Sequence, residues 1–545
     1  MIAPDVFCQH YAEFLDDTYD VVDRLVLNAY FSLGQSCGGF RNWWRVVHGS
    51  DETLDNTHLM RMAGRFARRV RGWAEKNHIP VITCGAGERK AEIAEQHRPT
   101  DPAFHGIFAV LVGRAPSPVW EVRRFGNGGI DLRRKSPMPW VNHYAFHIVD
   151  PQWGHVVLKV CGHAPFTAQI ILNGHEYTAC QARRARIGFT KEGNCFTEVS
   201  DTVGLAKVAD TLRSRTAIGR LREVCERWIY RCVCFGLSFD EQAKSGFHYD
   251  YSVYQIEYSR NLLFQRGRVM DQVFNGVIDR TRAPLNIKSL KTIFGYKNRP
   301  FHRNGSPPRF EVAVERPEYD LTVFKVHFGR LTLKIYTKGE RVLRIEAIAH
   351  NTVDLRCGRR LDRYPDMVAR LAAILERFME ALQGVDGGCI ADGTLDELPA
   401  PSQVGRTKVG GVDLNKRRMR AVIEAVIALS LLPEGFTGSE LADKVGAIVG
   451  EPYSSRQASY DLKKLRGKNL VQRIGRTRRY QSCRSGLQTL AALLVLREKV
   501  IKPVLAGAGR PRPGRPLKTR AVIDDHYHLL QTQLRALLSH LGIAA

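Results

Sequence analysis

The sequence is short of acidic residues and lacks the paired cysteines of common zinc modules. Its 545 residues contain 55 Asp and Glu against 81 Lys and Arg, a formal net charge of +26. This imbalance favours a polyanionic partner over a neutral metabolite. The 12 cysteines are scattered and no two form a C-x-x-C pair, which argues against a zinc ribbon or knuckle.

Long apolar runs are also missing. No stretch approaches the ~20 apolar residues that a membrane-spanning helix needs, and residues 1–5 do not resemble a signal peptide. We therefore expect a soluble, cytoplasmic protein with reduced thiols and no membrane partner.

A chain of this length predicts several domains, here an α/β and α+β multidomain protein. Mixed strand and helix patterns predict a small α/β domain with a basic helix over 1–137, and strand-rich patterns predict an α+β domain over 138–398. The remaining segments are a linker (399–414), a winged-helix domain (415–506), a basic Gly/Pro-rich linker (507–520) and a C-terminal helix (521–545). That last helix is a candidate for homo-oligomer formation.

Hydrophobic periodicity predicts the individual elements. The strands expected on this basis are 24–30, 79–82, 106–112, 144–150, 155–161 and 342–348. The helices expected on this basis are 40–45, 59–73 and 364–382.

The most informative stretch is 436–483, where two short helices precede an Arg-rich hairpin. Ser439 is placed to cap the first helix, and Ser454 or Ser455 the second. From residue 454 to 484 there are ten Lys or Arg and one acidic residue, so the segment carries +9. This order of elements is that of a winged helix, which typically places one helix in a DNA groove.

The residues expected to contact DNA lie on the second helix and the hairpin: Ser455, Arg456, Gln457, Tyr460, Lys463, Lys464, Arg473, Arg476, Arg478 and Arg479. The stretches 438–442, 458–465 and 467–471 resemble MarR-like winged-helix domains. The resemblance implies binding to duplex DNA, often as a dimer, and makes DNA a more expected partner than RNA. A protein-binding winged helix is the alternative.

A glycine-containing loop between a predicted strand and a predicted helix is a candidate phosphate site. It comprises Gly85, Gly87, Arg89 and Lys90, whose backbone N–H groups and cations could hold an anion. The loop lacks P-loop spacing, so NTPase chemistry is rejected, and an ordinary turn remains the alternative.

Histidines and carboxylates between 142 and 176 form the densest polar cluster. Asp150, His175 and Glu176 are candidate ligands for Mg²⁺ or Mn²⁺, and Asp150 is also a candidate catalytic residue. Histidines hydrogen-bonded at turns are the structural alternative.

The stretches 334–339 and 343–346 resemble a pattern in replication initiators of filamentous phages and small plasmids, Lys-x-Tyr-x-Lys followed by Leu-Arg-x-Glu. The resemblance implies that Glu346 is a metal ligand or base and that Tyr336 is a nucleophile or phosphate contact. The alternative is a cross-strand Lys/Glu pair on a solvated sheet face. Glu257 is a further candidate carboxylate.

Two classes of function follow. The first is a nucleic-acid-binding protein that docks through its winged helix, as a regulator or an architectural protein does. The second is a mobile-element or replication protein, in which the central region is a metal-dependent phosphodiesterase or nicking endonuclease. Binding is the claim that we hold at this stage, and enzymatic activity stays open.

Overall fold

The computed structural model describes residues 3–85, 87–125, 129–282, 323–328, 331–386, 392–430, 435–497 and 522–540. The basic linker expected over 507–520 lies outside these residues. Among them, no helix is both long and apolar enough to cross a membrane. The chain is a mixed α/β protein built around one large sheet.

Ten described strands form this sheet, in the order β12-β13-β14-β11-β1-β8-β7-β6-β3-β2. Their bounds are β12 Val323–Phe328, β13 Leu331–Lys338, β14 Val342–Ala349, β11 Tyr249–Phe264, β1 Leu15–Phe31, β8 Ala168–Asn173, β7 Gly154–Cys161, β6 Trp140–Asp150, β3 Gly106–Pro116 and β2 Val81–Thr83. The run from β1 through β8, β7 and β6 to β3 is antiparallel, and β2 pairs parallel to β3.

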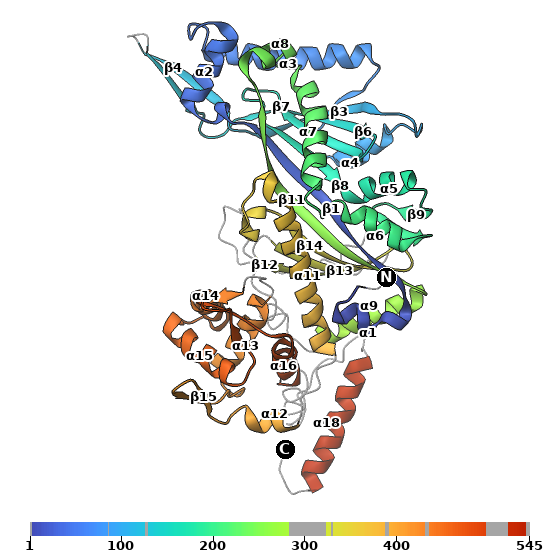
Figure 1. Cartoon of the computed structure of the whole chain (residues 1–545), viewed down its shortest axis with the longest axis vertical. Coiled ribbons are helices and arrows are strands. Elements are labelled where there is room, and N and C mark those ends of the chain that lie inside the picture. The colour runs from blue at the N-terminus through green and yellow to red at the C-terminus, as the bar shows by residue number, and fades with distance from the viewer. Residues whose placement is uncertain are drawn as a thin grey trace. The chain divides into compact units, whose positions relative to one another are not determined.

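The neighbouring strands β1 and β11 are the long ones, at 17 and 16 residues (Figure 1). Both are buried for most of their length, and Val21, Val22 and Val26 of β1 are at most 3% exposed. Branched apolar side chains suit a strand covered on both faces. A charged residue inside such a strand therefore needs a partner.

The sheet joins strands from both sides of the boundary expected at residue 137. β3 pairs with β6, and β1 pairs with β8. By compactness the chain divides instead into residues 20–259 with 348–369, and residues 1–19, 260–347 and 370–545. The strands β1, β11 and β14 each contain residues of both units.

Helices surround the strands in both units. Before the end of β14 they are α1 Val6–His10, α2 Cys37–His48, α3 Asn56–Lys76, α4 Lys90–Gln96, α5 Gly174–Arg184, α6 Thr202–Asp210, α7 Ala217–Val233, α8 Phe239–Ser245 and α9 Gly267–Arg282. After it come α11 Tyr364–Asp386, α12 Asp392–Glu397 and α18 Val522–His540. The remaining hairpins are β4–β5 (Trp120–Arg124, Ile130–Arg134), β9–β10 (Phe189–Glu192, Cys195–Val199) and β15–β16 (Ser402–Val404, Thr407–Val409).

The two faces of the sheet in unit 20–259 differ. On one face, Tyr144 of β6 contacts Phe66 of α3, and Phe146 stacks on Phe235, which follows α7. Side chains on this face of β7 are buried, whereas His155, Val157 and Lys159, which point the other way, are only half-buried. The second face is covered in part by α4, whose Ala94 packs on Leu111 and Ala145.

Residues 417–495, the C-terminal module, form a bundle of four helices with a small sheet. The helices are α13 Arg417–Leu429, α14 Gly438–Val449, α15 Ser455–Gly467 and α16 Arg484–Val495. The strands are β17 Phe436–Thr437, β18 Gln472–Arg473 and β19 Arg479–Gln481, in the order β17-β19-β18. Capping boxes begin α14 at Thr437 and α15 at Ser454. The cap expected at Ser439 is therefore wrong, because Thr437 takes that position.

Most of the elements expected from periodicity are confirmed, although the structure extends them. The strand expected over 24–30 is the second half of β1, and the helix expected over 59–73 is the middle of α3. The hairpin of β6 and β7 and the helix from Tyr364 are also present.

Candidate metal centre

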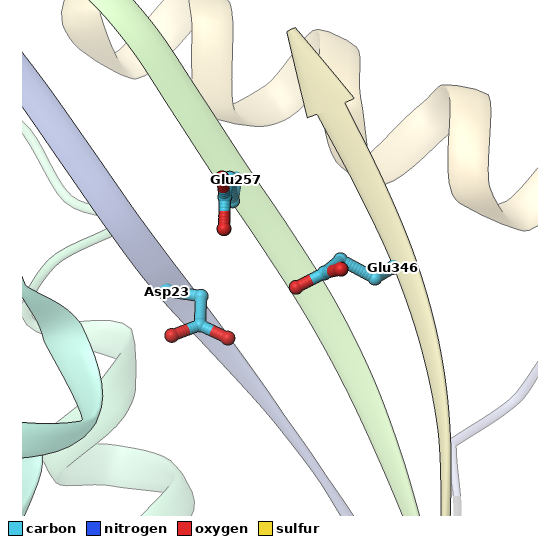
Figure 2. A group of neighbouring side chains, drawn as sticks. All are labelled: Asp23, Glu257 and Glu346. Atoms are coloured by element: carbon cyan, nitrogen blue, oxygen red, sulfur yellow. The ribbon is translucent and has the colours of Figure 1, made fainter. Parts of the chain in front are cut away.

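Three carboxylates come together on three neighbouring strands. Asp23 lies on β1, Glu257 on β11 and Glu346 on β14, and the sheet places β11 between the other two. One carboxylate oxygen from each lies within 4.8 Å of those of the other two. Figure 2 shows the three side chains pointing toward one another. We call these residues the carboxylate cluster.

The cluster is buried from solvent. Asp23 is 1% exposed and Glu346 is 3% exposed, while Glu257 is half-buried. Removing carboxylates from water is costly, and three of them at this spacing repel one another. A divalent cation bound between them would relieve both costs, and hard oxygen ligands suit Mg²⁺ or Mn²⁺.

Donors around the cluster fix the orientation of each carboxylate. The amide of Asn194 donates to both oxygens of Asp23 at 3.1 and 3.2 Å. The amide of Gln255 donates to Glu257 at 2.7 Å. Such outer contacts aim the remaining lone pairs toward a shared centre.

His175, expected as a metal ligand, lies behind Asp23. It is fully buried, and its Nδ1 is 3.1 Å from Oδ1 of Asp23. The residue sits in the first turn of α5, where the side chain of Asn173 accepts its backbone N–H. Since a carboxylate only accepts, the imidazole nitrogen facing it carries a proton. His175 therefore holds the carboxylate of Asp23 in place and is not one of the three residues of the carboxylate cluster.

Lys334 of β13 reaches the cluster from its outer side. Its ammonium is 3.1 Å from Oε2 of Glu346 on the neighbouring strand. This is the cross-strand Lys/Glu pair that we considered as an alternative. However, Glu346 is buried, whereas that alternative expected a solvated face.

Tyr336 lies two residues beyond Lys334 and is half-buried. Alternation along a strand puts both side chains on the same face of β13. The phenol is therefore on the side of the strand from which Lys334 approaches Glu346.

Asp150 and Glu176 are not brought to the carboxylate cluster. Asp150 accepts from Arg227 at 2.6 Å and from the indole of Trp228 at 2.7 Å. Burial raises the pKa of Glu176, but Lys191 and then Arg98 lower it, and the net position is below its usual range. Both residues belong to ion pairs away from the cluster.

In the loop expected to hold phosphate, two of the proposed phosphate-binding groups already contact carboxylates of the chain itself. The backbone N–H of Gly85 donates to the carboxylate of Glu88 at 2.8 Å. Arg89 pairs with Glu92 at 2.7 Å, while Gly87 adopts a positive φ of 89° at the turn. Lys90 begins α4 and extends toward β3, where a Cβ on Gly113 would come within 2.5 Å of its ammonium.

The residues expected to contact DNA divide into exposed and engaged groups. The exposed group is Ser455, Arg456, Tyr460, Lys463, Arg476 and Arg478. Gln457 is exposed as well, but its side chain accepts from Ser454 in the capping box of α15. Lys464 is held 3.5 Å from Asp461, and Arg479 donates to the carbonyl of Gly435 at 2.7 Å. The guanidinium of Arg473 closes the hairpin by donating to the carbonyls of Thr477 and Arg476.

Sequence reasoning missed Asp23, which interrupts the apolar run from Val21 to Leu27. A carboxylate inside a strongly apolar strand was the available signal. It also missed Asn194, for which the sequence offered none.

Comparisons of the chain with protein-family models, with curated proteins and with solved structures give no match. The functional argument therefore depends on the geometry of the described residues.

Proposed function

We propose that this chain binds nucleic acid and cleaves its phosphodiester backbone with a divalent cation held by Asp23, Glu257 and Glu346. The observation that carries the proposal is the convergence of these carboxylates on β1, β11 and β14. A divalent cation there would polarise a phosphoryl oxygen and favour attack at phosphorus.

The chain's own residues supply the rest of the chemistry. The ammonium of Lys334 lies beside the Glu346 carboxylate and can stabilise charge that develops on the phosphoryl group. Tyr336 on the same face of β13 is a candidate nucleophile or phosphate contact, and water is the other candidate nucleophile.

The C-terminal module supplies affinity in this proposal. Its order of helix, strand, two helices and hairpin is that of a winged helix. Arg456 and Lys463 project from α15, and Arg476 and Arg478 from the hairpin, all of them exposed. These are the surfaces that face phosphates in such modules, which favours duplex DNA as the partner.

Cleavage is tested on supercoiled plasmid and labelled single strands, with Mg²⁺, Mn²⁺ or EDTA. Wild-type protein should nick or cut in either metal and not in EDTA, and Glu346→Gln and Glu257→Gln should abolish the reaction. Glu75→Gln, an exposed carboxylate on α3, is the matched control.

Metal binding is measured separately by calorimetric titration with Mn²⁺. We expect wild type and Glu75→Gln to bind, and both cluster variants to bind far more weakly. If the protein binds nucleic acid but neither cleaves it nor binds Mn²⁺, the proposed enzymatic activity is refuted. That result would favour a regulator, in which the sheet has another role.

A further inference from the structure

A cavity of about 890 Å³ opens on the second face of the sheet, within unit 20–259 and 348–369. Five cationic side chains are among the residues that line it: Lys90, Arg114, Lys159, Arg359 and Arg360. The residues that line it include no Asp or Glu. We call it the basic cavity.

The floor of the basic cavity is a row of side chains from four paired strands. Asn28 of β1 pairs with Gln169 of β8, which pairs with Lys159 of β7, which pairs with Ala145 of β6. Directly paired residues share a face, so these side chains form one row across the sheet. The amide of Gln169 donates to Asn28 at 3.0 Å, and Lys159 lies between polar and apolar positions of the row.

One wall is the N-terminus of α4. Ala94 and Ile93 pack that helix on the sheet, which directs Lys90, its first residue, over β3. The ammonium of Lys90 lies where a side chain at position 113 would be, because a Cβ on Gly113 would be 2.5 Å away. The absence of a side chain at Gly113 therefore leaves room for the ammonium of Lys90 in the cavity.

The opposite wall is the segment around Arg359 and Arg360, which pairs with the first residues of β11. The backbone N–H of Val253 donates to the carbonyl of Arg359 at 2.8 Å, and Ser252 forms a bridge with Arg360. Backbone pairing therefore fixes both arginines at the edge of the cavity. The Nε of Arg359 is buried and has no hydrogen-bond partner among the described residues, whereas Arg360 lies 3.7 Å from Asp362.

The electrostatics of the basic cavity call for an anion. Burial lowers the pKa of Lys159, and the charges of Arg24 and Lys90 lower it further. Burial also lowers the pKa of His143; its hydrogen bond to the carbonyl of Val141 raises that pKa in part, and the charges of Lys159 and Lys90 lower it. Cations gathered around a cavity whose lining contains no carboxylate are a net cost to folding that a bound anion would offset.

We propose that the basic cavity binds the phosphate backbone of a single nucleic-acid strand. The cations are spread over the floor and both walls, as a chain of phosphates requires and one phosphate does not. The cavity's size suits a few nucleotides of one strand and not a duplex. Tyr30 and His143 line it as well, and their rings offer surfaces on which bases stack.

The basic cavity is distinct from the carboxylate cluster. Asp23 and Asn28 both lie on β1, but five positions apart they point to opposite faces. Binding of a nucleic-acid strand in the basic cavity therefore does not depend on metal binding at the carboxylate cluster. The proposed cleavage activity and the proposed strand-binding site can fail separately.

The test is fluorescence anisotropy of a short 5′-labelled oligothymidylate in EDTA. The background carries Arg456→Ala and Lys463→Ala, which removes cations of the C-terminal module. Lys159→Met should weaken binding roughly tenfold and make its salt dependence shallower, since each lost phosphate contact removes about 0.7 from the slope. Adding Arg359→Met should weaken it further. Lys244→Met, an exposed lysine on α8, should have no effect.

Unfolding is excluded as a cause within the same experiment. Every tryptophan lies between positions 43 and 228, so tryptophan fluorescence reports on this unit. Lys159→Met should melt at the same temperature as the background or higher, because it removes a crowded charge.

Unchanged oligothymidylate affinity in the double variant would overturn the proposal. Complete displacement of the oligonucleotide by dTTP at equal phosphate concentration would also overturn it, in favour of a nucleotide site. Mn²⁺ binding by the cavity variants should match wild type whichever result is obtained.

Discussion

The C-terminal module and the central sheet use charge in opposite ways. In the module, exposed cations such as Arg456 and Arg478 come from a stretch of about 25 residues on one helix and one hairpin. In the sheet, the carboxylates come from positions 23, 257 and 346, and two of them are almost fully buried. The first arrangement is local and solvated, and the second depends on the whole sheet.

This difference determines how each region should respond to substitution. Exposed charges act through a screened field, and each contributes little on its own. Buried groups in a shared centre act together, so loss of one member disables the whole. The four predictions below compare the regions on this basis.

Asp461 is expected to give the largest effect, because it is a fully buried carboxylate in a module whose basic side chains on α15 and the hairpin are mostly exposed. It is 0% exposed and accepts from the phenol of Tyr453 at 2.8 Å, and Arg418 lies 3.2 Å away. Asp461→Ala should destabilise the module by about 3 kcal/mol, since it leaves the Tyr453 phenol without its acceptor and Lys464, whose side chain is 11% exposed, without its partner. Hydrogen exchange over residues 417–495 of the full chain measures this loss.

Asp443→Ala, an exposed carboxylate on α14, is the control and should leave exchange unchanged. Metal-dependent cleavage of single strands by Asp461→Ala should persist, because Asp461 has a structural role whereas the cluster has a chemical one. Equal hydrogen-exchange rates in Asp461→Ala and Asp443→Ala would contradict the prediction, because the buried carboxylate would then stabilise the module no more than the exposed one.

Lys334 gives the next largest effect, and it tests the chemistry of the sheet. Its ammonium contacts Glu346 at 3.1 Å. Lys334→Met should slow cleavage about 100-fold, as loss of one preorganised charge does elsewhere. Mn²⁺ affinity should be kept or increased, because a cation that competes for Glu346 is gone.

Lys338→Met removes a lysine of the same strand and should cleave at close to the wild-type rate. A similar loss in both variants would mean that net charge, and not the contact with Glu346, is responsible.

The sequence predicted the local elements of both regions. Apolar spacing placed α3, α11 and the β6–β7 hairpin, and the two helices of the C-terminal module. Each of these depends on contacts between residues close in the chain, which is why periodicity finds them. Ser439 was the local exception, since the capping box at Thr437 competes for the same turn.

The carboxylate cluster was predictable only in part. Glu346 and Glu257 were candidates, but Asp23 is hundreds of residues away from both, and only pairing of β1, β11 and β14 brings them together. Asp150, also a candidate, lies on β6, three strands from β1 in the sheet, and forms an ion pair with Arg227 instead. Strand order is a long-range property, and one sequence does not carry it.

Lys444 of α14 offers a pH test of the module with a smaller effect. Burial lowers its pKa to about 8, whereas an unfolded chain keeps a lysine near 10.4. Between these values the unfolded state binds more protons, so the module should gain stability as pH rises from about 8 to 10. Lys444→Met should remove this gain and stabilise the module by on the order of 2 kcal/mol near pH 7. Exchange rates of variant and wild type, compared at each pH, measure both effects.

An unchanged difference between Lys444→Met and wild type across that pH range would show that Lys444 keeps its charge. Lys416→Met, an exposed lysine before α13, should show no pH-dependent difference.

The smallest effect is expected for single exposed cations of α15. Arg456→Ala and Lys463→Ala should each weaken duplex binding about fivefold and reduce the salt slope by about 1, as loss of one phosphate contact does. Their effects should add, because exposed charges on separate turns share no partner. Binding isotherms at several salt concentrations measure both quantities, with Lys244→Ala of α8 as the matched control. A loss of hundredfold in either variant would mean that α15 reads bases through a desolvated contact, and the module would then resemble the sheet in depending on one buried arrangement.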